Sequence, residues 1–107
     1  MSEAQHVVAL VTAPADRAPE LARRIVEEKL AACVNILPGV RSIYVWKGEV
    51  CDDSEALLVI KTRAALFEAL RARVVALHPY EVPEVIELPI LDGHAPYLKW
   101  LDESTTP

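Results

Sequence analysis

Two long apolar segments flank the dipeptide Lys47-Gly48, and they restrict the possible folds more than any other part of the sequence. Glycine adopts a positive φ without steric cost, so the dipeptide suits the two-residue turn of a β-hairpin. Counting outward from this turn pairs Tyr44 with Cys51 and Ile36 with Val59. Each arm then approaches about 14 residues, well beyond the usual strand of about 5–6 residues. The sequence therefore predicts one unusually long hairpin.

The end of this hairpin carries apolar or aromatic residues on both faces, along Ser42–Trp46. The core of a chain this size covers only one face of its sheet, and exposed strand edges invite pairing. We therefore expect copies of the chain to cover one another in a homo-oligomer. The alternative is that Tyr44 and Trp46 fold back on their own domain. Pro38-Gly39 and residues 52–54 interrupt the arms, which predicts a bend or bulge partway along.

Strand and helix patterns alternate through the rest of the chain. Short runs of β-branched residues predict strands, and apolar residues spaced three and four apart predict amphipathic helices. The predicted elements are strands at 6–11 and 85–88 and helices at 18–30, 63–77 and 97–103. With the hairpin, the order is βαββαβ followed by a C-terminal helix. We predict a single domain over residues 1–107 with an α+β fold, the ferredoxin-like sandwich.

The ends of these elements carry recognisable signals. Asp16 and Thr62 can act as helix N-caps, and Pro79 ends the second helix. Pro89 lacks a backbone donor, which places the last strand at an edge of the sheet. We expect residues Ser104 to Pro107 to fray.

Charge and composition narrow the function. The chain has 16 acidic and 11 basic residues, a net charge of -5, and no Lys/Arg-rich run, so we predict no nucleic-acid partner and no membrane partner. No apolar run approaches the roughly 20 residues of a membrane helix, and the first residues lack a secretion signal, so we expect a cytoplasmic protein. Cys33 and Cys51 form no CxxC pair, unlike a disulfide framework or a four-ligand zinc site.

The loop between the second helix and the last strand carries an imidazole, a phenol and two carboxylates between two prolines, which stiffen it. His78 with Glu81 or Glu84 supplies nitrogen and oxygen donors for a divalent metal, and Cys33 would add sulfur if the second strand lies close. Each residue also has a structural interpretation. His78 could cap the helix C-terminus, Glu84 could pair with Lys61, and Cys33 could be a small buried residue.

The other polar residues of the strands give weaker indications of a binding or catalytic site. Asn35 lies in an apolar strand, where its amide needs partners, so it is either a hydrogen-bond hub or a cleft residue. Cys33 with His78 is the only candidate pair of nucleophile and base, and the isolated glycines form no phosphate-binding loop. We therefore predict no enzymatic activity.

Several motifs together resemble the CutA divalent-cation-tolerance family, and they span nearly the whole chain. The matching segments are Thr12-Ala13-Pro14, Glu28-Lys29-Leu30-Ala31-Ala32-Cys33-Val34-Asn35, Pro38-Gly39, Ser42-Ile43-Tyr44, Trp46-Lys47-Gly48, Lys61-Thr62, His78-Pro79-Tyr80, Pro83-Glu84, Tyr97-Leu98 and Trp100-Leu101. The resemblance implies a homotrimer of ferredoxin-like subunits joined by the long hairpins, similar in shape to the PII signalling proteins. It also implies a link to copper and other divalent cations.

Two departures from the family bear on that metal. Some members carry a cysteine before Thr-Ala-Pro and a second histidine before His-Pro-Tyr, where this chain has Val11 and Leu77. A tight copper site cannot be built on those two positions. We predict instead that copper(II) or another divalent cation binds weakly, at a site formed from His78, Glu84, Glu81 and Cys33.

The alternative function is a PII-like sensor that binds a small ligand in clefts between subunits. The residues that we assign to such a cleft are Asn35, Tyr44, Trp46, Lys61 and Tyr80.

Overall fold

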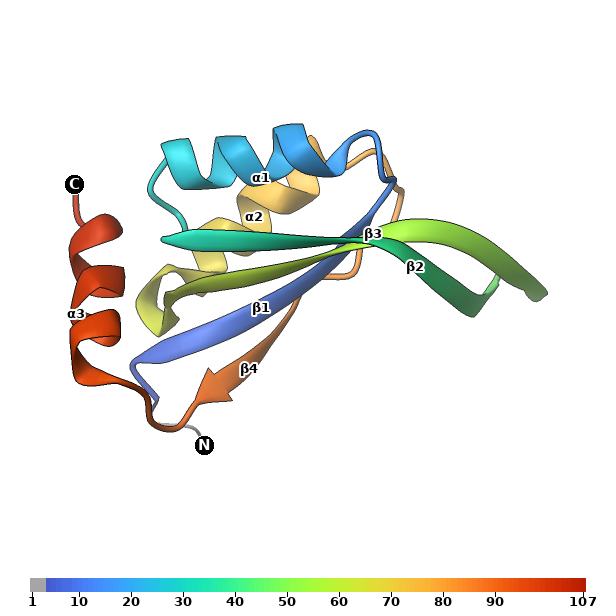
Figure 1. The fold of residues 1–107 in the computed structure, drawn as a ribbon. Helices are drawn as coiled ribbons and strands as arrows, with labels where there is room; N and C mark the ends of the chain where they lie inside the picture. The colour runs from blue at the N-terminus through green and yellow to red at the C-terminus, as the bar shows by residue number, and fades with distance from the viewer. Residues whose placement is uncertain (1–3) are drawn as a thin grey trace.

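The computed structural model describes residues 4–107 (Figure 1). The elements in chain order are β1 (His6–Ala13), α1 (Ala18–Glu27), β2 (Cys33–Trp46), β3 (Glu49–Arg63), the 3-10 turn η1 (Ala64–Leu66), α2 (Phe67–Leu77), β4 (Ile86–Ile90) and α3 (Ala95–Ser104). Within the described part of the chain, no helix is long and apolar enough to cross a membrane.

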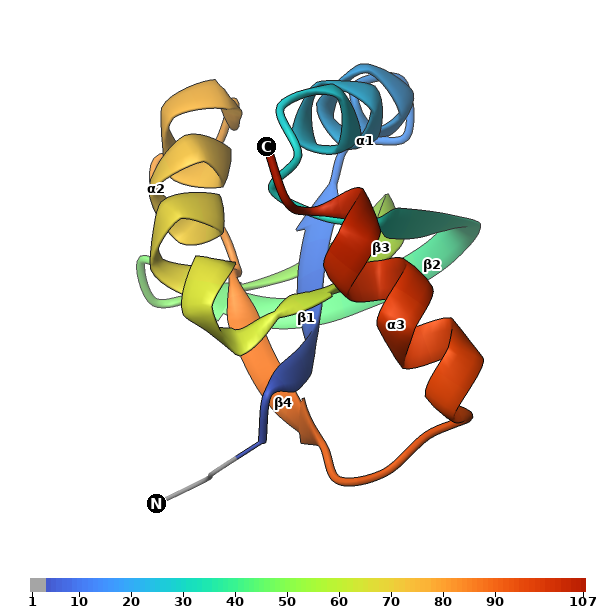
Figure 2. The same ribbon diagram turned by 90° about the vertical axis from the view of Figure 1, so that its left-hand side faces the viewer.

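The sheet has the order β2-β3-β1-β4, and every neighbouring pair is antiparallel. Helices α1 and α2 lie side by side on one face of it (Figure 2). The side chains that form the core between these layers include Ala9, Val11, Leu58 and Ile60 from the sheet and Leu21, Ile25, Leu70 and Val74 from the helices. This arrangement confirms the predicted ferredoxin-like sandwich, and it places the proline-containing strand β4 at an edge, as expected.

The hairpin is as long as predicted, with 14 residues in β2 and 15 in β3. Its turn holds Lys47 at φ 50° and Gly48 at φ 80°. The pairing of Tyr44 with Cys51 is confirmed, whereas the pairing of Ile36 with Val59 is wrong by one residue, because Ile36 pairs with Leu58.

A bulge in β2 explains this shift. Between Leu37 and Val40 the second strand contains one more residue than the facing stretch of β3, and Gly39 takes a φ of 73° there. The extra residue changes the register from that point toward the core. The interruption expected at residues 52–54 does not occur, because these residues pair regularly with β2.

Beyond the bulge, the hairpin projects past the helical layer (Figure 1). Because side chains alternate along a strand, its two faces differ. One face carries Tyr44 and Trp46, which are 42% and 38% exposed. The other carries Ile43, Val45 and Val50, which are more open at 65%, 68% and 75%. The described chain thus leaves an aliphatic face uncovered.

Two predicted helix caps are wrong. The residue at the N-cap of α1 is Arg17, and no side chain caps this end, so Asp16 does not do so. Thr62 belongs to β3 and is fully buried, and its hydroxyl donates to the carbonyl oxygen of Leu30 at 2.7 Å. The strand continues past the position where the helix was expected, so this hydroxyl ties β3 to the segment after α1.

The end of the chain is better ordered than expected. Thr105 is 2% exposed, and it accepts a hydrogen bond from Arg63 Nε at its Oγ1 (2.8 Å) and another from the Arg63 guanidinium at its carbonyl oxygen (2.9 Å). The His6 ring lies 2.8 Å from a carboxylate oxygen of Asp102. The prediction that residues 104–107 fray is therefore wrong for Thr105.

Candidate functional groove

A groove with a volume of about 940 Å³ lies between the outer part of the hairpin and the loop that follows α2. Its lining comes from three parts of the chain: the end of β1, the hairpin, and the loop. The lining residues are Thr12, Pro14, Ser42, Ile43, Tyr44, Val45, Trp46, Asp53, Ser54, Glu55, Tyr80, Glu81, Val82 and Glu84. Aromatic rings and carboxylates therefore share one concave surface.

His78 fixes the loop but does not line the groove. Its side chain is buried, and Nε2 lies 2.7 Å from the carbonyl oxygen of Thr12, while Nδ1 lies 3.1 Å from the backbone N–H of Tyr80. A carbonyl only accepts, so Nε2 carries the proton and donates, and Nδ1 is the acceptor. Both ring nitrogens are therefore engaged with the backbone.

Tyr80 ties the same loop to β3. Its hydroxyl donates to Glu55 at 2.6 Å, and its ring lies 4.6 Å from the His78 ring, centroid to centroid. Glu55 is only 5% exposed although it carries a carboxylate. A buried carboxylate needs a donor, and Tyr80 provides one from across the groove.

A second tyrosine makes the same kind of pair on the hairpin. The Tyr44 hydroxyl lies 2.5 Å from Asp53, and this hydrogen bond, followed by desolvation, raises the Tyr44 pKa to about 12. Desolvation, followed by the hydrogen bond to Glu55, also raises the pKa of Tyr80. Both phenols are thus neutral donors near pH 7, so neither supplies a positive charge to its carboxylate partner.

The predicted metal ligands do not come together. Cys33 lies in the row of the sheet that contains Lys61 and Val8, whereas His78 is bonded to Thr12, four residues farther along β1 and roughly 13 Å away at a rise of 3.3 Å per residue. Both cysteines are partly buried free thiols. Within residues 4–107, no three His, Cys, Asp or Glu side chains converge as a metal site would require.

Glu81 and Glu84 line the groove, as the two ligands of the predicted set that reach it. The Glu81 carboxylate lies 3.7 Å from the Lys47 ammonium at the hairpin turn, and both side chains are about 70% exposed. Glu84 does not pair with Lys61, since Lys61 donates instead to the side-chain oxygen of Asn35.

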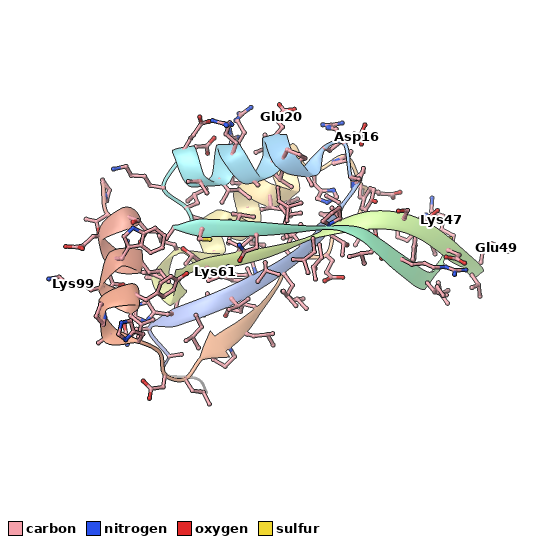
Figure 3. All side chains as sticks on the ribbon, viewed as in Figure 1. Asp16, Glu20, Lys47, Glu49, Lys61 and Lys99 are labelled. Atoms are coloured by element: carbon pink, nitrogen blue, oxygen red, sulfur yellow. The ribbon has the colours of Figure 1, made fainter. Side chains whose placement is uncertain are left out.

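The five predicted cleft residues divide into two groups. Tyr44, Trp46 and Tyr80 line the groove together. Asn35 and Lys61 bond to each other at the opposite end of the hairpin, and Figure 3 shows Lys61 far from Lys47. Asn35 is therefore part of a polar contact between β2 and β3 and lies outside this groove.

Sequence reasoning missed Asp53 and Glu55 as groove residues. A signal was present for Glu55, because it directly precedes the apolar run from Ala56 to Ile60 on a strand. A carboxylate at the border of a buried strand needs a specific donor. That donor, Tyr80, lies 25 residues along the chain, so only the folded chain identifies it.

Known proteins resemble this chain in sequence. Residues 7–104 match the family model described as CutA1 divalent ion tolerance protein. The divalent-cation tolerance protein CutA of Thermus thermophilus is 54% identical over 99 residues, which cover 92% of this chain and 96% of the relative. Human Protein CutA is 51% identical over 98 residues, covering 91% of this chain, but the match spans only 55% of that relative.

Solved structures of CutA proteins also resemble this chain over most of its length. CutA1 from Oryza sativa superimposes with a TM-score of 0.93 at 51% identity, covering 96% of this chain and 95% of that one. A structure from Nostoc sp. PCC 7120, described as a PII-like protein CutA in apo form, superimposes with a TM-score of 0.89 at 37% identity, covering 94% and 97% of the two chains.

Proposed function

Because the chain belongs to the CutA1 divalent ion tolerance family, we propose that it acts as a homotrimer that binds divalent cations, copper(II) among them. The observation that supports this most directly is the outer hairpin. It carries exposed aliphatic side chains, and it also lines a groove that contains carboxylates. The aliphatic side chains favour association between copies, and the carboxylates favour the binding of cations.

The aliphatic face of the hairpin, which we define as Ile43, Val45 and Val50, supports association between copies. These three side chains are 65–75% exposed and lie beyond the helical layer. Burying a side chain of this kind contributes roughly 1.5–3 kcal/mol, so three copies of the face supply a substantial driving force. A closed ring of identical subunits would also cover the strand edges.

Mass measurements test this assembly. Light scattering of the wild-type protein should give three times the mass of one chain. Val45→Asp places a charge on the aliphatic face, which the proposed trimer would bury, and should dissociate the assembly. Val75→Asp is a matched control, because Val75 is an exposed valine on α2, away from the hairpin. A monomeric wild-type protein, or a Val45→Asp variant that keeps its mass, would contradict the proposal.

Cation binding is assigned to Glu81 and Glu84, whose exposed carboxylates line the groove. Oxygen donors suit divalent cations that keep several water ligands. His78 is not assigned as a ligand, because a metal at its Nδ1 would have to displace the N–H of Tyr80. With carboxylates alone we expect a Kd on the order of 10–100 μM for copper(II).

Calorimetric titration with copper(II) tests these ligands. The double variant Glu81→Gln, Glu84→Gln keeps the shape of both side chains and removes both charges, so it should weaken binding about tenfold or more. Glu103→Gln in α3 lies outside the groove and should leave binding unchanged. Undiminished copper binding by the double variant would refute this assignment.

A second candidate function is a PII-like small-ligand sensor. It is favoured by the size of the groove and by the superposition on the Nostoc protein described as PII-like. The chemistry of the lining determines which ligand such a sensor would take.

A further inference from the structure

The hairpin turn holds an ammonium group of the chain itself against the groove. Lys47 Nζ lies 5.5 Å from the centroid of the Trp46 ring and 3.7 Å from the Glu81 carboxylate. Trp46 and Glu81 both line the groove, and Figure 3 shows Lys47 near the end of the hairpin. An alkylammonium is thus already positioned between an aromatic face and a carboxylate, a combination that recognises organic cations.

This internal contact is weak enough to be replaced. The Lys47 and Glu81 side chains are 70% and 71% exposed, and solvent-exposed ion pairs contribute little. The lysine side chain is also flexible, so a ligand ammonium could take its place at low cost.

Three further carboxylates line the groove. Asp53 and Glu55 accept hydrogen bonds from neutral phenols, and Glu84 lies on the loop. Among residues 4–107, no Lys or Arg nitrogen forms an ion pair with any of these three carboxylates. The groove therefore combines a site that holds one ammonium with additional charge that lacks cations.

We propose that this groove binds small aliphatic polyamines, and that Lys47 occupies the outer ammonium position until a polyamine replaces it. The outer amine of the ligand contacts Trp46 and Glu81. A second amine lies near Asp53 and Glu55, with the alkyl chain against the tyrosine rings. The polyamine site shares Glu81 with the metal site of the proposed function, but it also uses the Trp46 ring, which contributes nothing to a hydrated metal ion, so a Trp46 variant tests it separately.

The ligand class follows from what each part of the lining can recognise. A hydrated divalent metal would use the carboxylates and leave the rings unused. A single quaternary ammonium would use the Trp46 ring and leave most of the charge unmatched. A flexible chain with two or more ammonium groups engages both kinds of group.

Calorimetric titration with spermine tests the proposal through three variants. Lys47→Asn removes the competing ammonium and keeps a residue that tolerates the positive φ of 50° at this position. It should tighten spermine binding by roughly threefold to fivefold. Trp46→Leu and Glu81→Gln should each weaken it by a similar factor. Light scattering of each variant reports whether the assembly is retained.

Matched controls separate this site from general attraction to an acidic protein. Lys99→Asn changes the net charge as Lys47→Asn does, but it lies on α3 at the other end of the molecule (Figure 3), so it should not tighten spermine binding. Magnesium ions, added as magnesium chloride, should bind with the same affinity to the wild-type protein and to the Trp46→Leu variant. These results would support the polyamine site whether or not copper(II) binds at Glu84.

Three outcomes would overturn the proposal. The first is spermine binding that does not change in either Trp46→Leu or Glu81→Gln. The second is equal tightening by Lys47→Asn and Lys99→Asn, which would indicate net charge alone. The third is no detectable spermine binding by the wild-type protein at millimolar concentration.

Discussion

Replacing His78 with Ala should destabilise the protein without reducing its affinity for copper(II). The side chain is 8% exposed, and the substitution removes its bonds to the Thr12 carbonyl and the Tyr80 N–H. Each hydrogen bond contributes about 1 kcal/mol net, and a buried partner left without its bond costs about 1–3 kcal/mol. We therefore expect the free energy of unfolding to fall by about 2–4 kcal/mol.

Denaturant unfolding of wild type and variant measures this loss, with copper(II) calorimetry on the same samples. His94→Ala is the matched control, because His94 is an exposed histidine at the start of α3 and its replacement should change stability by less than about 0.5 kcal/mol. The structural role of His78 would be refuted by a variant that keeps full stability but binds copper(II) more than tenfold more weakly. That result would make His78 the ligand expected from its residue type.

Two further predictions concern Tyr44 and Thr105. Because the folded protein raises the Tyr44 pKa from 10 to about 12, this pair stabilises the fold fully below pH 10 and progressively less as pH rises through about 12. Ultraviolet titration should show late ionisation of both Tyr44 and Tyr80, and Asp53→Asn should bring the ionisation of Tyr44 to lower pH; an unchanged titration of this variant would exclude the pair. Thr105→Ala removes the hydroxyl that accepts from Arg63, so the free energy of unfolding should fall by about 1–2 kcal/mol, against a smaller change for exposed Thr106→Ala. Equal changes in both variants, by denaturant unfolding, would refute that role.

Local signals in the sequence predicted the elements of the fold well. The dipeptide Lys47-Gly48 determines the register near the turn, because the pairing there depends on a few adjacent residues. The register near the core was wrong, since the number of residues absorbed by a bulge depends on how β2 and β3 each pack on the rest of the sheet. Pro38-Gly39 indicated where the bulge lies but not its effect on pairing.

The loop after α2 shows which properties of the candidate site could be predicted from the sequence and which could not. Its stiffness and its polar groups were evident from the two prolines and the residue types. The role of His78 was not, because its main partner, Thr12, lies 66 residues earlier in the chain. A histidine followed by carboxylates looks the same in sequence whether its nitrogens bind a metal or the backbone, and only long-range packing separates the two.

The bulge at Gly39 also has a consequence for how the protein can vary. The register of the outer hairpin is determined by the turn, while the register near the core is determined by β1 and the helices, and the one extra residue in β2 reconciles the two. No neighbour lies within 4 Å of a side chain added at Gly39, so the surroundings do not constrain this site. A residue gained or lost here would leave Tyr44 opposite Cys51, facing the same groove. This ribbon can therefore change its length at the bulge while its outer part keeps the side chains that line the groove.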